Sequence, residues 1–334
     1  MTNPTIAVLG TGRIGKMHAE LIARQVPGLD LLSVFDVYAE SAQAVGSDLG
    51  VEVAGSVEDI LSSDVDAVAI CTSTDTHVDL VVAAAEAGKA IFLEKPVSLN
   101  LAEVDRAAAA VEAAGVPVQI GFNRRFDAAH AAVQQAVANG DVGDVHLLRI
   151  TSRDPAPPPI EYINVSGGIF LDMTIHDFDM ARFVTGSEVV EVYAKADVRI
   201  DPAIGEAGDV DTAVIVLTHE NGAITTIDNS RQAVYGYDQR VEAFGSAGLA
   251  VSENPRSHTA EVHKADGTTL TTIPYFFLER YIPSYLAEWT GFLDGLRSGT
   301  MPVSMADGRE PLVIGLAAWQ SVREGRPVQT SEIG

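Results

Sequence analysis

Residues 5–15 read Thr-Ile-Ala-Val-Leu-Gly-Thr-Gly-Arg-Ile-Gly. Residues 6–9 form an apolar run of strand length, and the glycines after them follow the spacing Gly-x-Gly-x-x-Gly at the start of a helical pattern. In a strand–turn–helix unit the first glycine permits a tight turn, the second lets a pyrophosphate approach the backbone, and the third lets the helix pack on the sheet. Free N–H groups and the dipole at the helix N-terminus attract that anion. The stretch therefore predicts a dinucleotide site at Gly10, Gly12, Arg13, Ile14 and Gly15.

An acidic residue, Asp36, ends the second predicted strand, residues 31–35. A carboxylate at this point accepts hydrogen bonds from the adenine ribose hydroxyls and repels a 2′-phosphate. Residues 37–39, Val-Tyr-Ala, offer no arginine or lysine to hold such a phosphate. We therefore expect NAD as the cofactor, with NADP less favoured. Two alternatives stay open, namely Asp36 as a helix N-cap and the glycines as an ordinary turn in another α/β domain.

Composition limits the classes of protein that the chain can represent. A length of 334 residues predicts about two domains, and 47% apolar residues allow large cores. No apolar stretch approaches the ~20 residues of a membrane span, and the first strand begins too early to leave room for a signal peptide. The single cysteine, Cys71, and a net charge of −24 favour a cytoplasmic protein that binds neither membrane nor nucleic acid.

The first 120 residues alternate strand and helix patterns, which predicts a Rossmann domain with a parallel sheet over residues 1–121. Residues 122–334 are expected to form an α+β domain with a large, mostly antiparallel sheet, and the last helices are expected to pack back on the first domain. Asn221-Gly222 predicts a hairpin turn. Predicted strands are 5–9, 31–35, 66–70, 90–93, 117–120, 145–152, 188–199, 210–218, 223–230, 240–244 and 260–264. Predicted helices are 14–25, 39–49, 56–62, 75–87, 100–114, 126–138, 276–297 and 305–323.

Polar residues follow the predicted strand 66–70 at its carboxyl end. Ligands of parallel sheets bind beyond this edge, so we expect Thr72, Ser73, Thr74 and His77 near the cofactor. Helix capping by Thr74 is an alternative that is compatible with this role.

Glu94-Lys95-Pro96 ends the strand 90–93 at the same sheet edge. The Lys95 ammonium could hydrogen-bond a substrate hydroxyl and stabilise charge as that hydroxyl loses its proton. Pro96 makes a cis peptide bond after Lys95 one option, because X–Pro bonds are the usual place for it. The alternative for Lys95 is a surface lysine paired with Glu94.

Asp172 and His176 are separated by four residues, so on one helix they would share a face. Their apolar neighbours predict a buried helix, in which unpaired polar groups would be costly. Hydride transfer from an alcohol gives such a pair a purpose, because histidine can accept the hydroxyl proton near neutral pH. A structural Asp–His pair stays open. We expect no metal site, because the sequence lacks a cysteine cluster or a His-x-x-x-His ligand set.

The glycine motif, Glu94-Lys95-Pro96 and Asp172…His176 occur in the order found in the Gfo/Idh/MocA oxidoreductase family, which the chain resembles over almost its whole length. It is most similar to the bacterial inositol dehydrogenases of that family. The segments that carry this closer resemblance are 121–127, 152–155, 172–177 and 235–238.

The resemblance implies a Rossmann domain, an open-faced C-terminal sheet domain, and a homotetramer assembled through that sheet. It implies NAD-dependent oxidation of myo-inositol to 2-keto-myo-inositol (scyllo-inosose), with His176 as general base, Lys95 polarising the reacting oxygen and Asp172 as a relay. Asn123, Arg153, Asp154 and Tyr235 join the three catalytic residues as implied substrate contacts. Asp154 departs from an asparagine in some relatives, and a carboxylate cannot donate a hydrogen bond.

Three alternatives to this function stay open. The first is the same chemistry on scyllo-inositol, D-chiro-inositol or a pyranose such as glucose. The second is a non-catalytic NAD-binding sensor or transcriptional co-regulator on the same fold. The third is a glycosidase that uses NAD for transient oxidation.

Overall fold

A computed structural model describes residues 2–334, and the chain folds into two compact units. The first unit runs to Asn123 and includes Tyr285–Glu310, whereas the second comprises Arg124–Ser284 and Pro311–Gly334. Within residues 2–334, none of the helices is long and apolar enough to cross a membrane.

The first unit is built on a parallel sheet of six strands in the order β3-β2-β1-β4-β5-β6. The apolar side chains of residues 6–9 and 67–70 are fully buried, as expected for strands covered on both faces. The strand order reverses between β1 and β4, and the carboxyl ends of strands at such a point are where ligands bind. The strands are β1 (Thr5–Leu9), β2 (Asp30–Phe35), β3 (Glu52–Val53), β4 (Ala67–Ile70), β5 (Ala90–Glu94) and β6 (Val118–Gly121).

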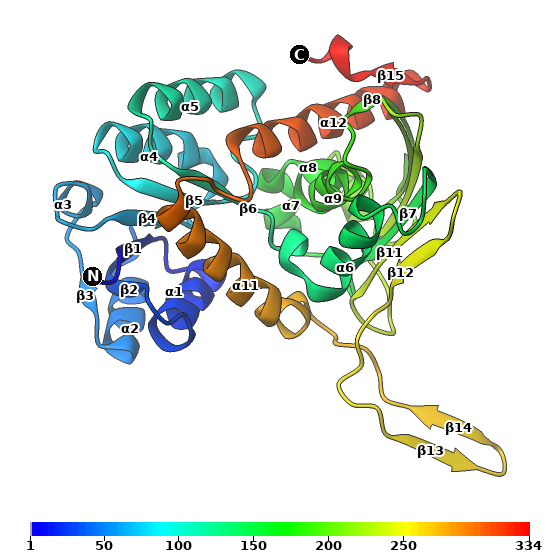
Figure 1. The fold of residues 1–334 in the computed structure, drawn as a ribbon, viewed down its shortest axis with the longest axis horizontal. Helices are drawn as coiled ribbons and strands as arrows, with labels where there is room; N and C mark the ends of the chain where they lie inside the picture. The colour runs from blue at the N-terminus through cyan, green and yellow to red at the C-terminus, as the bar shows by residue number, and fades with distance from the viewer. Residues whose placement is uncertain (1) are drawn as a thin grey trace. The chain divides into compact units, whose positions relative to one another are not determined.

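Helices cover both faces of this sheet, with α1 and α2 on one side and α4 and α5 on the other (Figure 1). Part of a later helix, α11 (Phe277–Ser298), also belongs to this unit, where Trp289 stacks on Phe92 with ring centroids 4.3 Å apart. The predicted Rossmann architecture is confirmed, and only the two-residue β3 was missed among its strands. The remaining helices are α1 (Arg13–Gln25), α2 (Ala39–Leu49), α3 (Val57–Leu61), α4 (Thr74–Glu86) and α5 (Leu101–Ala114).

The second unit is built on a sheet of seven strands in the order β12-β11-β7-β10-β9-β8-β15. The neighbours pair antiparallel except β7 and β10, which run parallel, so the predicted mostly antiparallel sheet is confirmed. The predicted turn at Asn221-Gly222 joins β9 to β10. The strands are β7 (Val145–Arg153), β8 (Val189–Asp197), β9 (Thr212–His219), β10 (Ile224–Ser230), β11 (Asp238–Gly245), β12 (Leu249–Ser252) and β15 (Val328–Gln329).

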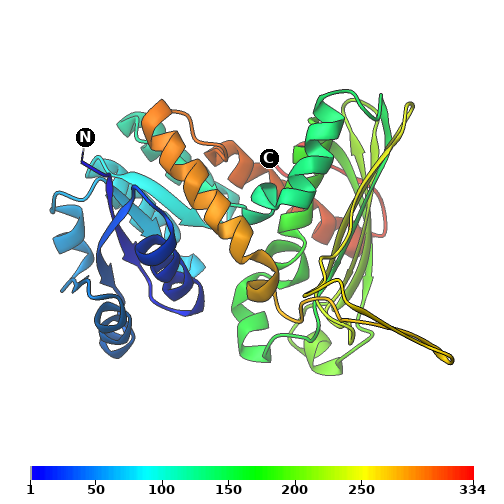
Figure 2. The same cartoon turned by 60° about the horizontal axis from the view of Figure 1, so that its bottom comes forward.

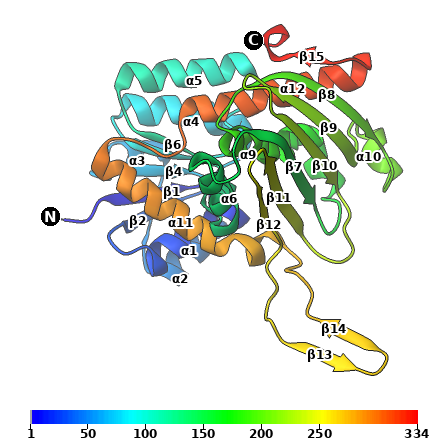
Figure 3. The same ribbon diagram turned by 45° about the vertical axis from the view of Figure 1, so that its right-hand side comes forward.

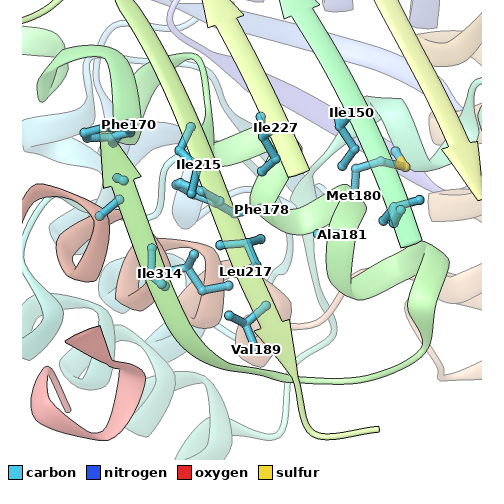
Figure 4. Close-up of a cluster of buried hydrophobic side chains, with 14 of the residues drawn as sticks. Ile150, Phe170, Phe178, Met180, Ala181, Val189, Ile215, Leu217, Ile227 and Ile314 are labelled. Carbon is cyan, nitrogen blue, oxygen red and sulfur yellow. The ribbon is translucent and has the colours of Figure 1, made fainter. Parts of the chain in front are cut away.

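Helices pack on one face of this sheet, which Figure 2 shows nearly edge-on. Phe170 and Phe178 meet Ile215 and Leu217 of β9 in the core between helices and strands (Figure 4). The helices of the unit are α6 (Ala128–Ala138), α7 (Ile160–Ser166), α8 (Gly168–Asp172), α9 (Ile175–Thr185), α10 (Pro202–Glu206) and, from Pro311 onward, α12 (Met305–Glu324).

The opposite face of the same sheet exposes large apolar side chains. Strand residues alternate between faces, so Ile215 and Leu217 point to the core while Val214, directly before Ile215, is 52% exposed. Other strands repeat this alternation and together form an open apolar face. Its exposed residues are Leu147, Tyr193, Val214, Ile224, Phe244, Leu249 and Val251.

The predicted strand 260–264 does not join the large sheet. It forms β13 (Glu261–Lys264), which pairs only with β14 (Gly267–Leu270) in a solvent-exposed hairpin that extends away from the seven strands (Figure 3). The alternating pattern was recognised correctly, but local alternation does not specify which partner a strand finds. The short elements α7, α10, β12, β14 and β15 were not predicted.

Candidate functional site

The glycine loop joins β1 to α1 in the first unit. Gly10 has φ +90°, and a Cβ there would lie 2.7 Å from the Cys71 carbonyl oxygen. A Cβ on Gly15 would lie 1.9 Å from the Gly10 carbonyl oxygen, so both positions exclude side chains for packing reasons. A Cβ on Gly12 would meet nothing within 4 Å among the described residues. Packing therefore does not require a glycine at position 12. Close approach of a pyrophosphate to the start of α1, at Arg13 and Ile14, would require one.

Asp36 directly follows β2, next to this loop. Its Oδ2 accepts the Thr11 N–H at 2.6 Å, and its Oδ1 accepts the Tyr38 N–H at 2.9 Å. The N-cap of α2 is Tyr38, so the alternative of Asp36 as that N-cap is wrong. The Thr11 hydroxyl also lies 3.0 Å from Oδ2, whereas Oδ1 can accept a second hydrogen bond, so the group fits a ribose hydroxyl.

The loop after β4 begins α4, with Ser73 as the N-cap and Thr74 as the first helical residue. His77 on this helix is buried, and its Nδ1 lies 2.8 Å from the Pro96 carbonyl oxygen, while its Nε2 lies 3.2 Å from that of Thr72. Burial lowers the pKa of His77, which keeps the ring neutral. The neutral His77 ring thus lies between the loop after β4 and the loop after β5, and its one N–H donates to one of the two carbonyl oxygens rather than reaching into solvent.

Lys95 follows the last residue of β5 and is half-buried. The Lys95–Pro96 peptide bond is cis, as the sequence allowed. Glu94 receives the Lys95 backbone N–H on Oε2 at 3.2 Å, while its Oε1 lies 2.7 Å from Nε2 of His18. Asn123, two residues beyond β6, is buried, and its Nδ2 finds no hydrogen-bond partner among residues 2–334. A buried donor of this kind is costly unless a ligand accepts from it.

Asp172 and His176 lie in the second unit, but not on one continuous helix as predicted. Asp172 ends α8 and His176 lies in the first turn of α9, with Met173 and Thr174 between the helices. The Thr174 hydroxyl donates to Oδ1 of Asn229 at 2.6 Å, and its N–H donates to the Ile169 carbonyl at 2.8 Å. The hydrogen bond from the Thr174 side chain to β10 competes with the backbone hydrogen bonds of a continuous helix, which explains the break between α8 and α9.

A buried ion pair between Arg124 and Asp177 also holds the start of α9. Asp177, next to His176, accepts from Arg124 at 2.6 Å and from Nδ2 of Asn229 at 2.8 Å. Burial raises the pKa of Asp177, although the Arg124 charge opposes that shift. The arrangement fixes the backbone that carries His176.

Asp172 is surrounded by residues that the sequence did not single out. The Tyr162 hydroxyl donates to its Oδ1 at 2.8 Å, and Nη1 of the buried Arg231 lies 3.7 Å from its Oδ2. Nη2 of Arg231 lies 3.4 Å from Oδ2 of Asp209. Burial, followed by the Asp172 charge, raises the pKa of Tyr162, so it stays protonated as a donor. An arginine directly after the predicted strand 223–230 was the signal that could have revealed Arg231.

Asp154 is half-buried near the same charges. Burial raises its pKa to about 6, with Arg231 opposing the shift and Asp172 adding to it. Its backbone is fixed between strands, because its N–H donates to the Ser230 carbonyl at 2.9 Å and its carbonyl accepts from Ala233 at 2.7 Å. A carboxyl group with such a pKa can exchange a proton near neutral pH.

Arg153 and Tyr235, the other predicted substrate contacts, pair with each other instead of with Asp172. Nη1 of Arg153 donates to the Tyr235 hydroxyl at 3.1 Å, and its Nε donates to Asp228 at 2.7 Å. The Tyr235 hydroxyl donates to Asp238 at 2.7 Å. Neighbouring Ser152 is fully buried against the core, so strand alternation turns Arg153 toward the opposite face.

No group of three or more His, Cys, Asp or Glu side chains within residues 2–334 is arranged to hold a metal ion. The groups gathered in the second unit are a carboxylate with a fixed hydroxyl donor, a buried guanidinium, an imidazole and a carboxyl group titrating near neutrality. They suit hydrogen bonding to several hydroxyls and removal of a proton from one of them.

Comparison with known proteins agrees with this geometry. Residues 5–122 match the family model of the oxidoreductases with an NAD-binding Rossmann fold, and residues 130–251 match the GFO/IDH/MocA C-terminal domain. The chain is 50% identical over 331 residues to a myo-inositol 2-dehydrogenase of Thermotoga maritima, covering 98% of this chain and 99% of the relative.

Two solved structures extend the comparison. A myo-inositol dehydrogenase of Corynebacterium glutamicum is 40% identical, with a TM-score of 0.94 and 98% of each chain covered. A scyllo-inositol dehydrogenase of Lactobacillus casei, solved with bound NAD(H) and scyllo-inositol, is 28% identical with a TM-score of 0.91, covering 98% of this chain and 99% of that one. With both halves matched and relatives aligned end to end, the chain belongs to the Gfo/Idh/MocA family of NAD-binding oxidoreductases.

Proposed function

We propose that the protein oxidises myo-inositol to 2-keto-myo-inositol (scyllo-inosose) with NAD. One carbon loses a hydride to C4 of the nicotinamide and its hydroxyl loses a proton, so that a C=O bond forms and NADH is released. The observation that carries the proposal is the 50% identity to a myo-inositol 2-dehydrogenase along practically the whole of both chains. The single, buried Cys71 is consistent with work in the cytoplasm.

We assign the chemistry to Lys95, Asp172 and His176. His176 takes the hydroxyl proton as general base, and Lys95 hydrogen-bonds the reacting oxygen as charge develops on it. Asp172 orients the His176 imidazole or relays its proton, and is itself held by the hydroxyl of Tyr162 and the charge of Arg231. Asn123 and Asp154 are the further substrate contacts that their environment supports best, whereas Arg153 and Tyr235 are engaged with each other.

NAD is preferred over NADP in this proposal because of Asp36. Its carboxylate lies at the end of β2 beside the glycine loop, where a 2′-phosphate would meet like charge. Thr72, Ser73, Thr74 and Glu94 border the same sheet edge and complete the proposed cofactor site, with His77 supporting it from within.

Scyllo-inositol is the second candidate substrate, because a relative of TM-score 0.91 binds it. The two isomers differ in the orientation of one hydroxyl, which a single hydrogen-bonding group can distinguish. Initial rates of NADH formation with myo-, scyllo- and D-chiro-inositol and glucose test the assignment. We expect the largest kcat/KM for myo-inositol; a larger value for another polyol would replace it, and no NADH with any of them would favour a sensor.

We also propose a homotetramer that covers the open apolar face of the second unit. Exposed Val214, Phe244 and Leu249 lie on the strands of this face, and contiguous apolar surface of this kind marks interaction sites. Light scattering on wild type and on Phe244→Lys tests the assembly. We expect a tetramer for wild type and a smaller species for the variant, whereas a monomeric wild type would refute the proposal.

A further inference from the structure

A buried chain of hydrogen bonds in the first unit ends at Lys95, and two of its members, His18 and Trp289, have no part in the chemistry assigned above. The indole N–H of Trp289 donates to Nδ1 of His18 at 2.9 Å, and Nε2 of His18 lies 2.7 Å from Oε1 of Glu94. His18 and Trp289 are both fully buried. They come from α1 and α11, so the chain links the helix behind the glycine loop to the end of β5.

The chemistry of the indole determines which nitrogen of His18 carries the proton. An indole N–H can only donate, so Nδ1 of His18 must be the acceptor. The ring proton of the neutral imidazole therefore resides on Nε2, where it donates to the Glu94 carboxylate. Protonation of Nδ1 would set two N–H donors against each other. Glu94 is the charged group that contacts the His18 ring. The rings of Phe92 and Tyr285 pack edge-on against the imidazole, with centroid distances of 5.2 and 5.4 Å.

The other oxygen of Glu94 reaches the backbone of Lys95. Oε2 of Glu94 accepts the Lys95 N–H at 3.2 Å, so one carboxylate holds both the imidazole and the peptide of the lysine. Gly121 makes room for it, since a Cβ there would lie 3.2 Å from Cδ of Glu94. Burial, followed by the Glu94 charge, raises the pKa of Glu288 well above its usual value. Both causes favour the protonated form of Glu288.

We propose that His18 and Trp289 are positioning residues for Lys95: Trp289 fixes the His18 tautomer, and the Nε2 proton of His18 holds Glu94 and, through it, the Lys95 backbone. The proposal rests on the catalytic role proposed for Lys95. Its consequence is that the segment carrying the lysine is tied to α1, the helix at whose start the dinucleotide would bind. Trp289 acts through two intervening side chains and touches neither substrate nor cofactor in this scheme.

The tautomer can be measured without any activity. Nitrogen NMR of ¹⁵N-histidine-labelled protein, with the His18 signals identified by their loss in His18→Gln, reports which ring nitrogen is protonated. We expect the ring proton on Nε2 in wild type, and an altered tautomer in Trp289→Phe. A wild-type ring protonated on Nδ1, or a His18 spectrum unchanged in Trp289→Phe, would overturn the proposal.

Kinetics then separate positioning from cofactor binding. Trp289→Phe keeps a ring against Phe92 but loses the N–H, so we expect kcat to fall about tenfold while the Kd of NAD changes by less than about threefold. Trp319→Phe, at the second tryptophan, which packs on Phe170, is the matched control and should change neither. An equal kcat in Trp289→Phe and wild type would refute positioning, whereas inactive wild type with the expected tautomer would instead refute the proposed reaction.

Discussion

Replacing Asp154 with asparagine should stabilise the protein, and more so as the pH rises. The pKa of Asp154 is raised from 3.8 to about 6 in the folded state, chiefly by burial. Folding therefore favours the protonated acid. The stability that this group contributes is fully present below the unfolded pKa and is lost as the pH rises through the folded pKa.

The size of the effect follows from the shift. About two pKa units at 1.36 kcal/mol each give about 3 kcal/mol lost at pH 8, and about half of that is already lost at pH 5. Asparagine is nearly isosteric and carries no charge, so Asp154→Asn should exceed wild type in free energy of unfolding by up to about 3 kcal/mol at pH 8 and about 1.5 kcal/mol at pH 5. Urea-induced unfolding of the protein without cofactor at both pH values measures this. Lower pH is avoided because the pI is near 4.5.

Asp211→Asn is the control of opposite sign. Burial acts to raise the pKa of Asp211, but N–H groups of Arg199, Ile200 and Asp201 donate to its carboxylate at 2.7–3.1 Å and leave the pKa below its usual value. This variant should be less stable than wild type at both pH values. An advantage of Asp154→Asn that is equal at pH 5 and pH 8, or absent at pH 8, would refute the assignment of a raised pKa to Asp154.

Four further predictions concern the site. His176→Asn should lower kcat by a factor of about 100 or more with little change in NAD affinity, measured by steady-state kinetics and calorimetry, and wild-type activity should rise with pH as the base loses its proton. Asp36→Ala should raise the kcat/KM for NADP relative to NAD, and an unchanged ratio would leave Asp36 a purely structural role. Tyr162→Phe removes a hydrogen bond to Asp172 and should lower kcat about tenfold, with unfolding free energy changed by only about 1 kcal/mol. Burial raises the pKa of Glu288 in the folded state, so the wild-type protein should lose stability as the pH rises above the usual glutamate range. Glu288→Gln should remove this loss in urea-induced unfolding, and an identical pH dependence in wild type and variant would contradict the raised pKa.

The sequence alone determined those features that depend on residues close together along the chain. The glycine spacing of residues 10–15, the apolar runs of β1 and β4, and the alternation of β9 each follow from local sterics and side-chain periodicity, and the fold class followed from their order. Glu94-Lys95-Pro96 was likewise recognised as a unit.

Tertiary structure decided the contacts that join distant parts of the chain. Arg231, directly after β10, reaches Asp172 at the end of α8. Trp289 reaches His18 across 271 positions, because α11 returns to the first unit after every strand of the second sheet except β15. The break between Asp172 and His176 depends on Thr174 meeting Asn229, which lies on another strand. Periodicity within a segment reports which face is buried, but not which distant side chain will lie against it, and the proton positions and raised pKa values of this site depend on those distant partners.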